Sequence, residues 1–117
     1  MPIYDVVYYE KSDVDCPVST FIDEQTPQLQ AKILRTIDLL ATNGPDLREP
    51  HSKKLNDHIF ELRCQTDGER ARILYFFIKG RRIVLTHGFI KKTQKTPPKE
   101  IERAENYRRQ HLNSTKK

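Results

Sequence analysis

The 117-residue sequence has few of the residues that build several common kinds of site. Its two cysteines, Cys16 and Cys64, lie far apart and show no C-x-x-C or Cys/His spacing. We therefore expect neither a zinc site nor a disulfide-stapled secreted fold. The four glycines form no phosphate-binding loop and no nucleophile elbow. The sequence thus predicts free thiols, no metal, no cofactor, and neither acyl-transfer nor nucleoside-triphosphate chemistry.

Long apolar runs are also missing. No window reaches the roughly 18 apolar residues that a membrane-spanning helix needs. The N-terminal stretch MPIYDVVYYEKSD contains acidic residues and lacks the basic start and apolar run of a secretory signal. We therefore expect a cytoplasmic protein with no membrane contact.

Positive charge is in excess. Lys and Arg number 21 against 16 Asp and Glu, which gives a formal net charge of +5. Such a balance favours contact with polyanions such as nucleic acid, although a basic surface often serves solubility alone. The length suits a single domain, which we place at residues 1–112, followed by a disordered tail at 113–117.

Helix signals occur on both sides of a central region of strands. Pro17 suits the first turn of a short helix, and a second helix is predicted from Thr26-Pro27 to the stop signal Asn43-Gly44-Pro45. The stretch after Pro97-Pro98 is a third helix former. Because its apolar positions are few, we expect this helix to be mostly exposed.

Strand signals occupy the remaining segments. Residues 3–9 predict a short edge strand, and three strand-like runs, 59–64, 71–79 and 82–87, are joined by short turns that favour antiparallel pairing. Residues 46–58 are polar and predict a loop. The order β, α, α, β, β, β, α indicates an α+β fold, with a small antiparallel sheet, two N-terminal helices packed on one face, and a C-terminal helix.

Alternation along the strands decides which side chains share a face. Glu61 and Arg63 point one way from their strand, while their apolar neighbours point the other way. If the helices cover the apolar side, Arg72 of the next strand joins Glu61 and Arg63 on the uncovered face. Lys91 and Lys92 then leave the last strand near the rim of the sheet.

Two interpretations of these charges stay open. They could form a cross-strand ladder of salt bridges, worth from tenths of a kcal/mol to about 1 kcal/mol per pair. Alternatively, Arg63, Arg72, Lys91 and Lys92 form an anion pocket with Glu61 as proton acceptor. Cleavage of RNA through its own 2'-hydroxyl needs a base, stabilisation of the phosphate oxygens and neutralisation of the leaving 5'-oxygen. Arginine suits the phosphate because its planar fork engages two oxygens.

Histidines are further candidates for acid-base chemistry, because imidazole titrates near pH 6.5. His87 and His51 lead among the four histidines. Each also has a plainer interpretation: His87 ends a strand and could be packed and hydrogen-bonded, and His51 lies in a polar loop. Glu49, in the same loop, is either a loop carboxylate or an alternative base.

Three segments resemble a known family. They are Phe60-Glu61-Leu62-Arg63, Arg72-Ile73-Leu74-Tyr75 and the run HGFIKKTQKTP at residues 87–97. With residues 3–110 as a whole, they resemble the HigB-like branch of the RelE/ParE toxin superfamily, whose members include phage-derived proteins. The resemblance implies a RelE-like, microbial-ribonuclease-like fold. It also implies the toxin of a type II toxin-antitoxin pair, which enters the ribosomal A site and cleaves mRNA without a metal ion. The implied partners are mRNA, the ribosome and a small helix-turn-helix antitoxin.

The resemblance also assigns roles to residues. Arg72 matches the arginine set against the scissile phosphate, and Lys91 and Lys92 match a basic position after the last strand. Glu61 stands where RelE itself has a lysine, and Tyr107 is not clearly in register with the family's C-terminal catalytic tyrosine, so the base and the acid stay open. The candidate contacts with RNA are Lys53, Lys54, His51, His87 and Lys95.

Within the run that ends the last strand, Lys91 and Lys92 are the candidates for chemistry, and residues 94–98 are predicted to be linker and helix cap. Two alternatives to a nuclease remain open. One is a non-enzymatic inhibitor of gyrase, like ParE relatives, and the other is a module that only binds nucleic acid or an antitoxin.

Overall fold

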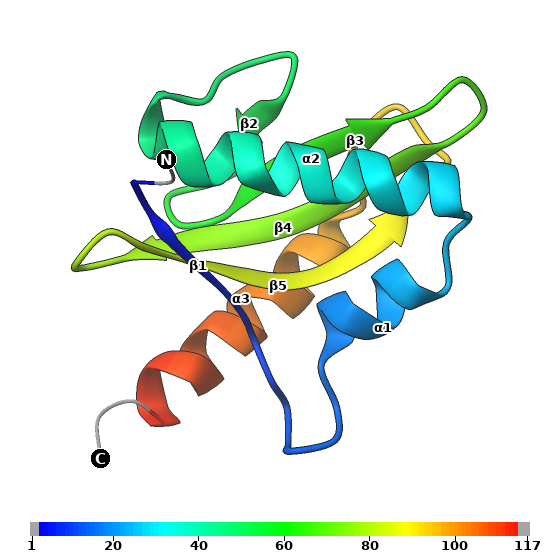
Figure 1. The fold of residues 1–117 in the computed structure, drawn as a ribbon. Helices are drawn as coiled ribbons and strands as arrows, with labels where there is room; N and C mark the ends of the chain where they lie inside the picture. Colours follow the sequence, from blue (N-terminus) through cyan, green and yellow to red (C-terminus); the bar gives the residue numbers. More distant parts are fainter. Residues whose placement is uncertain (1–2, 115–117) are drawn as a thin grey trace.

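The computed structural model describes residues 3–114. It contains one five-stranded sheet in the order β1-β5-β4-β3-β2, together with three α-helices and one 3-10 helix (Figure 1). The α+β prediction, with two N-terminal helices and one C-terminal helix, is confirmed. In chain order the elements are β1 (Asp5–Tyr8), α1 (Pro17–Asp23), α2 (Pro27–Asn43), η1 (Gly44–Asp46), β2 (Ser52–Lys54), β3 (Phe60–Gln65), β4 (Arg70–Ile78), β5 (Arg82–Ile90) and α3 (Pro98–Ser114).

The sheet departs from the prediction in two places. Strand β1 lies at an edge as expected but pairs with β5 in parallel, so the sheet is mixed rather than purely antiparallel. Strand β2 forms within the segment predicted to be a loop, and it pairs antiparallel with β3. Its polar sequence, Ser-Lys-Lys, lacks the apolar alternation of a strand, and backbone pairing with β3 overrides that weak propensity.

Both N-terminal helices begin at the predicted signals, and α2 also ends at its predicted stop signal. Thr26 caps α2, because its Oγ1 accepts a hydrogen bond from the Leu29 N–H at 3.2 Å, and Pro27 occupies the first turn. The helix ends at Gly44, whose φ of 53° is rarely adopted by residues with a Cβ. A Cβ atom at Gly44 would also lie 2.3 Å from the Tyr4 ring, so the glycine allows the N-terminal segment to pack here.

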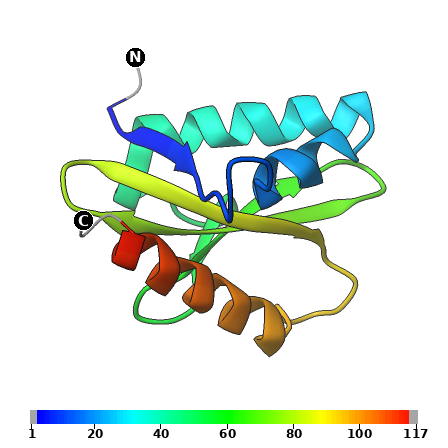
Figure 2. The same ribbon diagram turned by 90° about the horizontal axis from the view of Figure 1, so that it is seen from below.

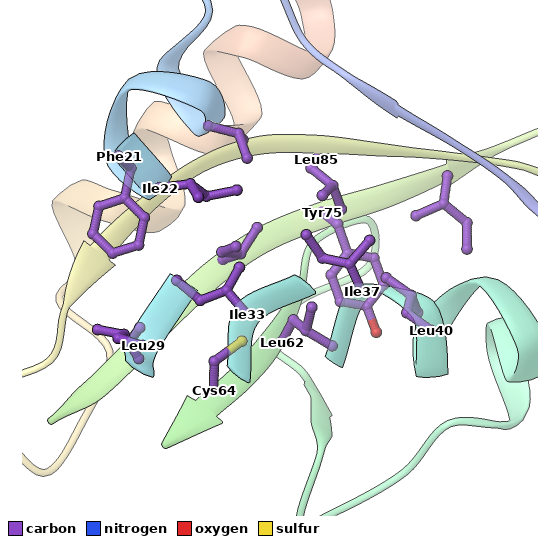
Figure 3. Packing of buried hydrophobic residues seen from close by; sticks show 14 residues of the cluster. Phe21, Ile22, Leu29, Ile33, Ile37, Leu40, Leu62, Cys64, Tyr75 and Leu85 are labelled. Carbon is purple, nitrogen blue, oxygen red and sulfur yellow. The ribbon is translucent and has the colours of Figure 1, made fainter. Parts of the chain in front are cut away.

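Helices α1 and α2 cover one face of the sheet (Figures 1 and 2). From α2, Leu29, Ile33 and Leu40 are fully buried, and they pack on a sheet face that includes Leu62 and Tyr75 (Figure 3). Their spacing along the helix puts them on a single stripe, which is why the sequence pattern predicted this helix well. This face forms the larger apolar core.

The opposite face of the sheet is partly covered by α3, which corrects the prediction that this face is uncovered (Figure 2). As predicted, most residues of the helix itself are exposed, and the rest are mainly half-buried. Ala104 and Tyr107 are buried against the sheet, and the Tyr107 ring stacks on Tyr9 at 4.7 Å between centroids. One small residue and one aromatic residue achieve this burial without a wide apolar stripe. The helix continues past residue 112 to Ser114, and the last three residues of the predicted tail, 115–117, lie outside the described residues.

A β-bulge between β4 and β5 shifts the alternation of β5. Leu74 pairs with His87 and Tyr75 pairs with Leu85, so Thr86 has no register partner, and its Oγ1 donates a hydrogen bond to the Leu74 carbonyl at 2.9 Å. An extra residue moves every later side chain to the other face. The side chain of His87 therefore points toward α3. Because alternation continues from there, Lys91, four residues later, lies on the same face of the sheet, which also holds Arg72.

Within residues 3–114, no helix combines the length and the apolar character needed to cross a membrane.

Candidate active site

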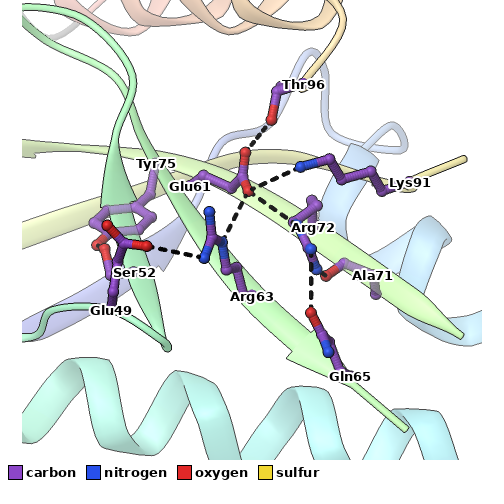
Figure 4. A network of polar contacts seen from close by, with 10 residues as sticks. All are labelled: Glu49, Ser52, Glu61, Arg63, Gln65, Ala71, Arg72, Tyr75, Lys91 and Thr96. Atoms are coloured by element: carbon purple, nitrogen blue, oxygen red, sulfur yellow. Dashed lines mark hydrogen bonds and ion pairs between the residues drawn. The ribbon is translucent and has the colours of Figure 1, made fainter. Parts of the chain in front are cut away.

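A buried carboxylate lies at the centre of the charged cluster. Glu61 is only 1% exposed. Its Oε1 lies 2.9 Å from Arg72 Nε, 3.3 Å from Arg63 Nε and 4.0 Å from Lys91 Nζ (Figure 4). Its Oε2 accepts a hydrogen bond from the Thr96 hydroxyl. One carboxylate thus faces three cations, so the cluster carries excess positive charge.

Separate parts of the chain supply these side chains. Glu61 and Arg63 alternate onto one face of β3, and the β3–β4 register places Arg63 directly opposite Arg72. Lys91 follows β5, where its N–H donates to the Arg70 carbonyl at 2.7 Å and keeps it beside β4. Thr96 comes from the loop that precedes α3. The cluster therefore forms only when β3, β4, the residue after β5 and the loop before α3 have come together.

Arg72 lies beneath the surface of the site and is 3% exposed. Its Nη1 donates to the Ala71 carbonyl at 3.0 Å, and its Nη2 donates to Gln65 Oε1 at 3.2 Å. Its Nε makes no hydrogen bond despite its distance from Glu61, so that contact is an ion pair. Burial lowers the pKa of Arg72 from its ordinary value, and Glu61 opposes this shift. These contacts hold the guanidinium in place below the cluster.

Arg63 connects the buried carboxylate to the surface. Its side chain is 19% exposed, and its Nη1 lies 3.4 Å from Glu49 Oε2, at the outer side of the cluster. The structure therefore gives Glu49 a pairing role with Arg63. Of the two predicted arginines, Arg63 reaches the surface, whereas Arg72 is buried.

Lys91 and Lys92 differ in their surroundings. Lys91 is buried, and this burial lowers the pKa of its ammonium group. Glu61 raises that pKa, while the cations Arg72, Arg63 and Arg70 lower it further. Lys92 is exposed and does not line the cavity described next. The two neighbouring lysines are therefore chemically distinct, a difference that the sequence does not reveal.

The cluster opens into a cavity of about 270 Å³, which we call the Glu61 pocket. It brings together most of the predicted site residues, and Arg72 lies beneath it. The residues that line it are Lys53, Lys54, Leu55, Glu61, Arg63, Lys91, Gln94, Lys95, Thr96 and Ile101. Five cations thus surround a single carboxylate in the wall of the cavity. Such a cavity favours an anion with several oxygen atoms, as a phosphate has.

The two leading histidines lie outside the Glu61 pocket. His87 is 2% exposed beneath α3, with its Nε2 3.1 Å from Glu100 Oε1 and its Nδ1 3.1 Å from the Thr86 hydroxyl. Burial lowers the pKa of His87, and Glu100 opposes this shift. The packed, hydrogen-bonded interpretation thus describes its surroundings. His51 is exposed, and its carbonyl accepts the Arg63 N–H at 2.8 Å.

Sequence reasoning missed the role of Thr96, which it grouped with the linker and helix cap. Thr96 donates a hydrogen bond to Glu61 and lines the Glu61 pocket, as do Gln94 and Lys95 from the same segment. The sequence does show a run of polar residues directly after the two lysines. Their spacing alone does not reveal whether a threonine there caps the next helix or donates a hydrogen bond to a distant carboxylate. Among residues 3–114, no three His, Cys, Asp or Glu side chains group closely enough to hold a metal ion.

The fold and the site define a small α+β protein with a basic pocket built around one carboxylate. The chain belongs to the family of phage-derived Gp49-like proteins, whose family model matches residues 20–109. This family is toxin-like and related to RelE and HigB. The narrower assignment to the HigB-like branch stays a prediction. No curated protein matches the chain.

Proposed function

We propose that this protein is the toxin of a type II toxin-antitoxin pair and cleaves mRNA in the ribosomal A site. The observation that carries the proposal is the Glu61 pocket, in which Arg63 and Lys91 lie beside Glu61 and the further cations Lys53, Lys54 and Lys95 line the same cavity. Membership of a toxin-like family supports the same conclusion.

In the proposed reaction, the 2'-oxygen of one nucleotide attacks the adjacent phosphorus while the bond from phosphorus to the 5'-oxygen breaks. The products are a 2',3'-cyclic phosphate and a free 5'-hydroxyl. Arg63 and Lys91 face the non-bridging oxygens, where negative charge develops. Arg72 holds Glu61 in position through their ion pair, and Arg72 is itself held by Gln65.

Lys91 is the proposed proton donor to the leaving 5'-oxygen. Burial and three neighbouring arginines lower its pKa, and a lysine with a lowered pKa transfers its proton more readily near neutral pH. Lys92, exposed at the end of the last strand, is proposed to contact a flanking phosphate, as are Lys53 and Lys54.

Two roles remain for Glu61, a general base or a brace that positions the cations. Both of its oxygens are already engaged, one by Arg63, Arg72 and Lys91 and the other by Thr96. A carboxylate held in this way is poorly placed to accept a further proton, so the contacts favour the bracing role. The proton of the 2'-hydroxyl then passes to water or to a ribosomal group.

The test is cleavage of a defined mRNA in a reconstituted translation system. The expected products carry 5'-hydroxyl and 2',3'-cyclic phosphate ends, and they form only when ribosomes are present. A single 2'-deoxynucleotide on the 5' side of the cut should abolish cleavage there, while the same change several nucleotides away serves as the control. Intact mRNA combined with gyrase-dependent DNA breaks would instead identify a gyrase inhibitor.

A cognate helix-turn-helix antitoxin is the proposed partner, and the cytoplasm, where ribosomes work, is the proposed location. The basic Glu61 pocket favours an acidic covering segment. Co-expression of a small helix-turn-helix protein encoded beside this chain should restore growth. Normal growth of cells that express this protein alone would contradict the toxin assignment.

A further inference from the structure

A second and larger hollow lies beside the Glu61 pocket. Its volume is about 680 Å³, and it is lined by Pro45, Leu47, Arg48, Glu49, Ser52, Lys53, Lys54 and Phe60. We call it the Phe60 hollow. Its size falls within the range of small-molecule and cofactor sites. Apolar surface from Leu47, Pro45 and Phe60 is combined with the cations Arg48, Lys53 and Lys54, so the hollow suits a flat apolar group that carries negative charge nearby.

Strand β2 lies between the two cavities and belongs to both. It is an edge strand, and its register pairs Lys53 with Glu61 and Lys54 with Phe60. Because neighbouring residues of a strand point to opposite faces, these lysines lie on the two sides of one sheet edge. Both nevertheless line both cavities. A chain of phosphates that crosses this edge would therefore meet lysines on both sides.

The Phe60 ring is held in a fixed orientation. It stacks on Tyr75 with 5.5 Å between centroids and 21° between planes, and it meets the edge of Phe77 at 5.1 Å. Tyr75 is itself anchored by a hydrogen bond with the Ser52 hydroxyl. Lys54 Nζ lies 6.0 Å from the centroid of the Phe60 ring. A rigid aromatic ring beside cations is the arrangement on which unpaired bases of single-stranded RNA stack.

We propose that the Phe60 hollow binds the unpaired base of a nucleotide next to the cleaved phosphate. The inference rests on the proposed function, since it takes the Glu61 pocket as the site of the scissile phosphate. The base stacks on Phe60 against the side chain of Leu47. Lys54 and Arg48 neutralise the phosphate of the same nucleotide. The base must be unstacked from its neighbours to enter, so a duplex does not fit.

The experiment measures binding of a short fluorescent single-stranded RNA to the purified protein by anisotropy. Every ribose is 2'-O-methylated so that the RNA cannot be cleaved, and an abasic residue is placed at each position in turn. In the wild-type protein, one abasic position should weaken binding about 5- to 100-fold, the range for loss of one stacked base. In Phe60→Leu that effect should fall to about 2-fold or less, while Phe60→Tyr, which keeps a stacking ring, should retain it.

Phe77→Leu is the matched control. Phe77 packs against Phe60 in the same aromatic group and does not line the hollow, so its replacement causes a similar packing loss and should leave the abasic effect unchanged. Wild-type protein provides a second readout, because 2-aminopurine at the sensitive position should lose fluorescence when it stacks. Equal abasic effects in wild type and Phe60→Leu, or unchanged 2-aminopurine fluorescence at every position, would overturn the proposal.

The two proposals fail in different ways. Ribosome-dependent cleavage could be absent while an abasic residue still weakens binding in a way that depends on Phe60. That result would support the base site and contradict the nuclease assignment. Cleavage together with an abasic effect that is the same in wild type and Phe60→Leu would support the nuclease assignment and contradict the base site. A hollow that receives a protein segment instead of RNA would show no abasic effect at any position.

Discussion

The side chains on the two faces of β3 are buried by different kinds of contact. Leu62 and Cys64 enter the apolar core under α2, where both are fully buried. Glu61, between Phe60 and Leu62, is buried to nearly the same extent on the other face, but among cations. Buried charge networks seldom stabilise a fold more than apolar residues of similar volume would. The charged face is therefore better explained by what it binds than by the stability it provides.

Breaking the charged face should have the largest effect on stability. In Glu61→Ala, Arg72 and Lys91 lose their shared anion while they remain buried, and the free energy of unfolding should fall by about 4 kcal/mol. Urea denaturation measures this change. Glu102→Ala, at an exposed position of α3, is the control and should cost about 0.5 kcal/mol or less. Equal costs for the two variants would show that Glu61 does not hold the cluster together.

A substitution on the apolar face of β3 should lower stability and leave RNA binding unchanged. Leu62→Ala leaves a cavity beneath α2 and should lower the free energy of unfolding by about 3 kcal/mol. At temperatures where the variant stays folded, RNA binding should match wild type, because Leu62 is fully buried and lines neither the Glu61 pocket nor the Phe60 hollow. Anisotropy with the 2'-O-methylated RNA measures binding. A large loss of affinity in the folded variant would mean that packing on the apolar face determines the geometry of the charged face.

The smallest expected effect concerns His87, on the α3 side of the sheet. Burial lowers its pKa in the folded state, so the unfolded chain binds the proton more readily, and stability should decrease as the pH falls below about 6.5. Above that pH, the neutral ring is accommodated in both states and this contribution is constant. His87→Gln should flatten the dependence of the thermal midpoint on pH between 7 and 5.

The exposed His58 supplies the matched control for this measurement. His58→Gln should leave the slope of the thermal midpoint against pH as it is in wild type. If His87→Gln keeps the full slope, another group is responsible for the dependence on pH.

Sequence patterns predicted the apolar side of the fold well and the charged side only in outline. Thr26, Pro27 and Gly44 carry local signals that need no tertiary context, so the limits of α2 were predictable. Alternation also placed Glu61, Arg63 and Arg72 on one face. These features depend on neighbours in the chain or on simple strand geometry.

The remaining features depend on contacts between distant segments. Nothing local marks the bulge at Thr86, yet it determines the face on which Lys91 lies. The burial of Arg72 follows from contacts with Gln65 and Glu61, and the hydrogen bond from Thr96 crosses from the loop before α3. Cover by α3 was missed because Tyr107 packs by stacking rather than through an apolar stripe.

The central claim is that the Glu61 pocket holds the phosphate that is cleaved. Single-turnover cleavage of ribosome-bound mRNA tests it most directly, with Arg63→Ala compared against Arg35→Ala. Arg35 is an exposed residue of α2 outside the pocket, so both variants lose one positive charge. We predict that Arg63→Ala slows cleavage on the order of 100- to 1,000-fold, as for loss of one group that stabilises developing charge, while Arg35→Ala stays within about 2-fold of wild type. Equal cleavage rates for the two variants would contradict the account.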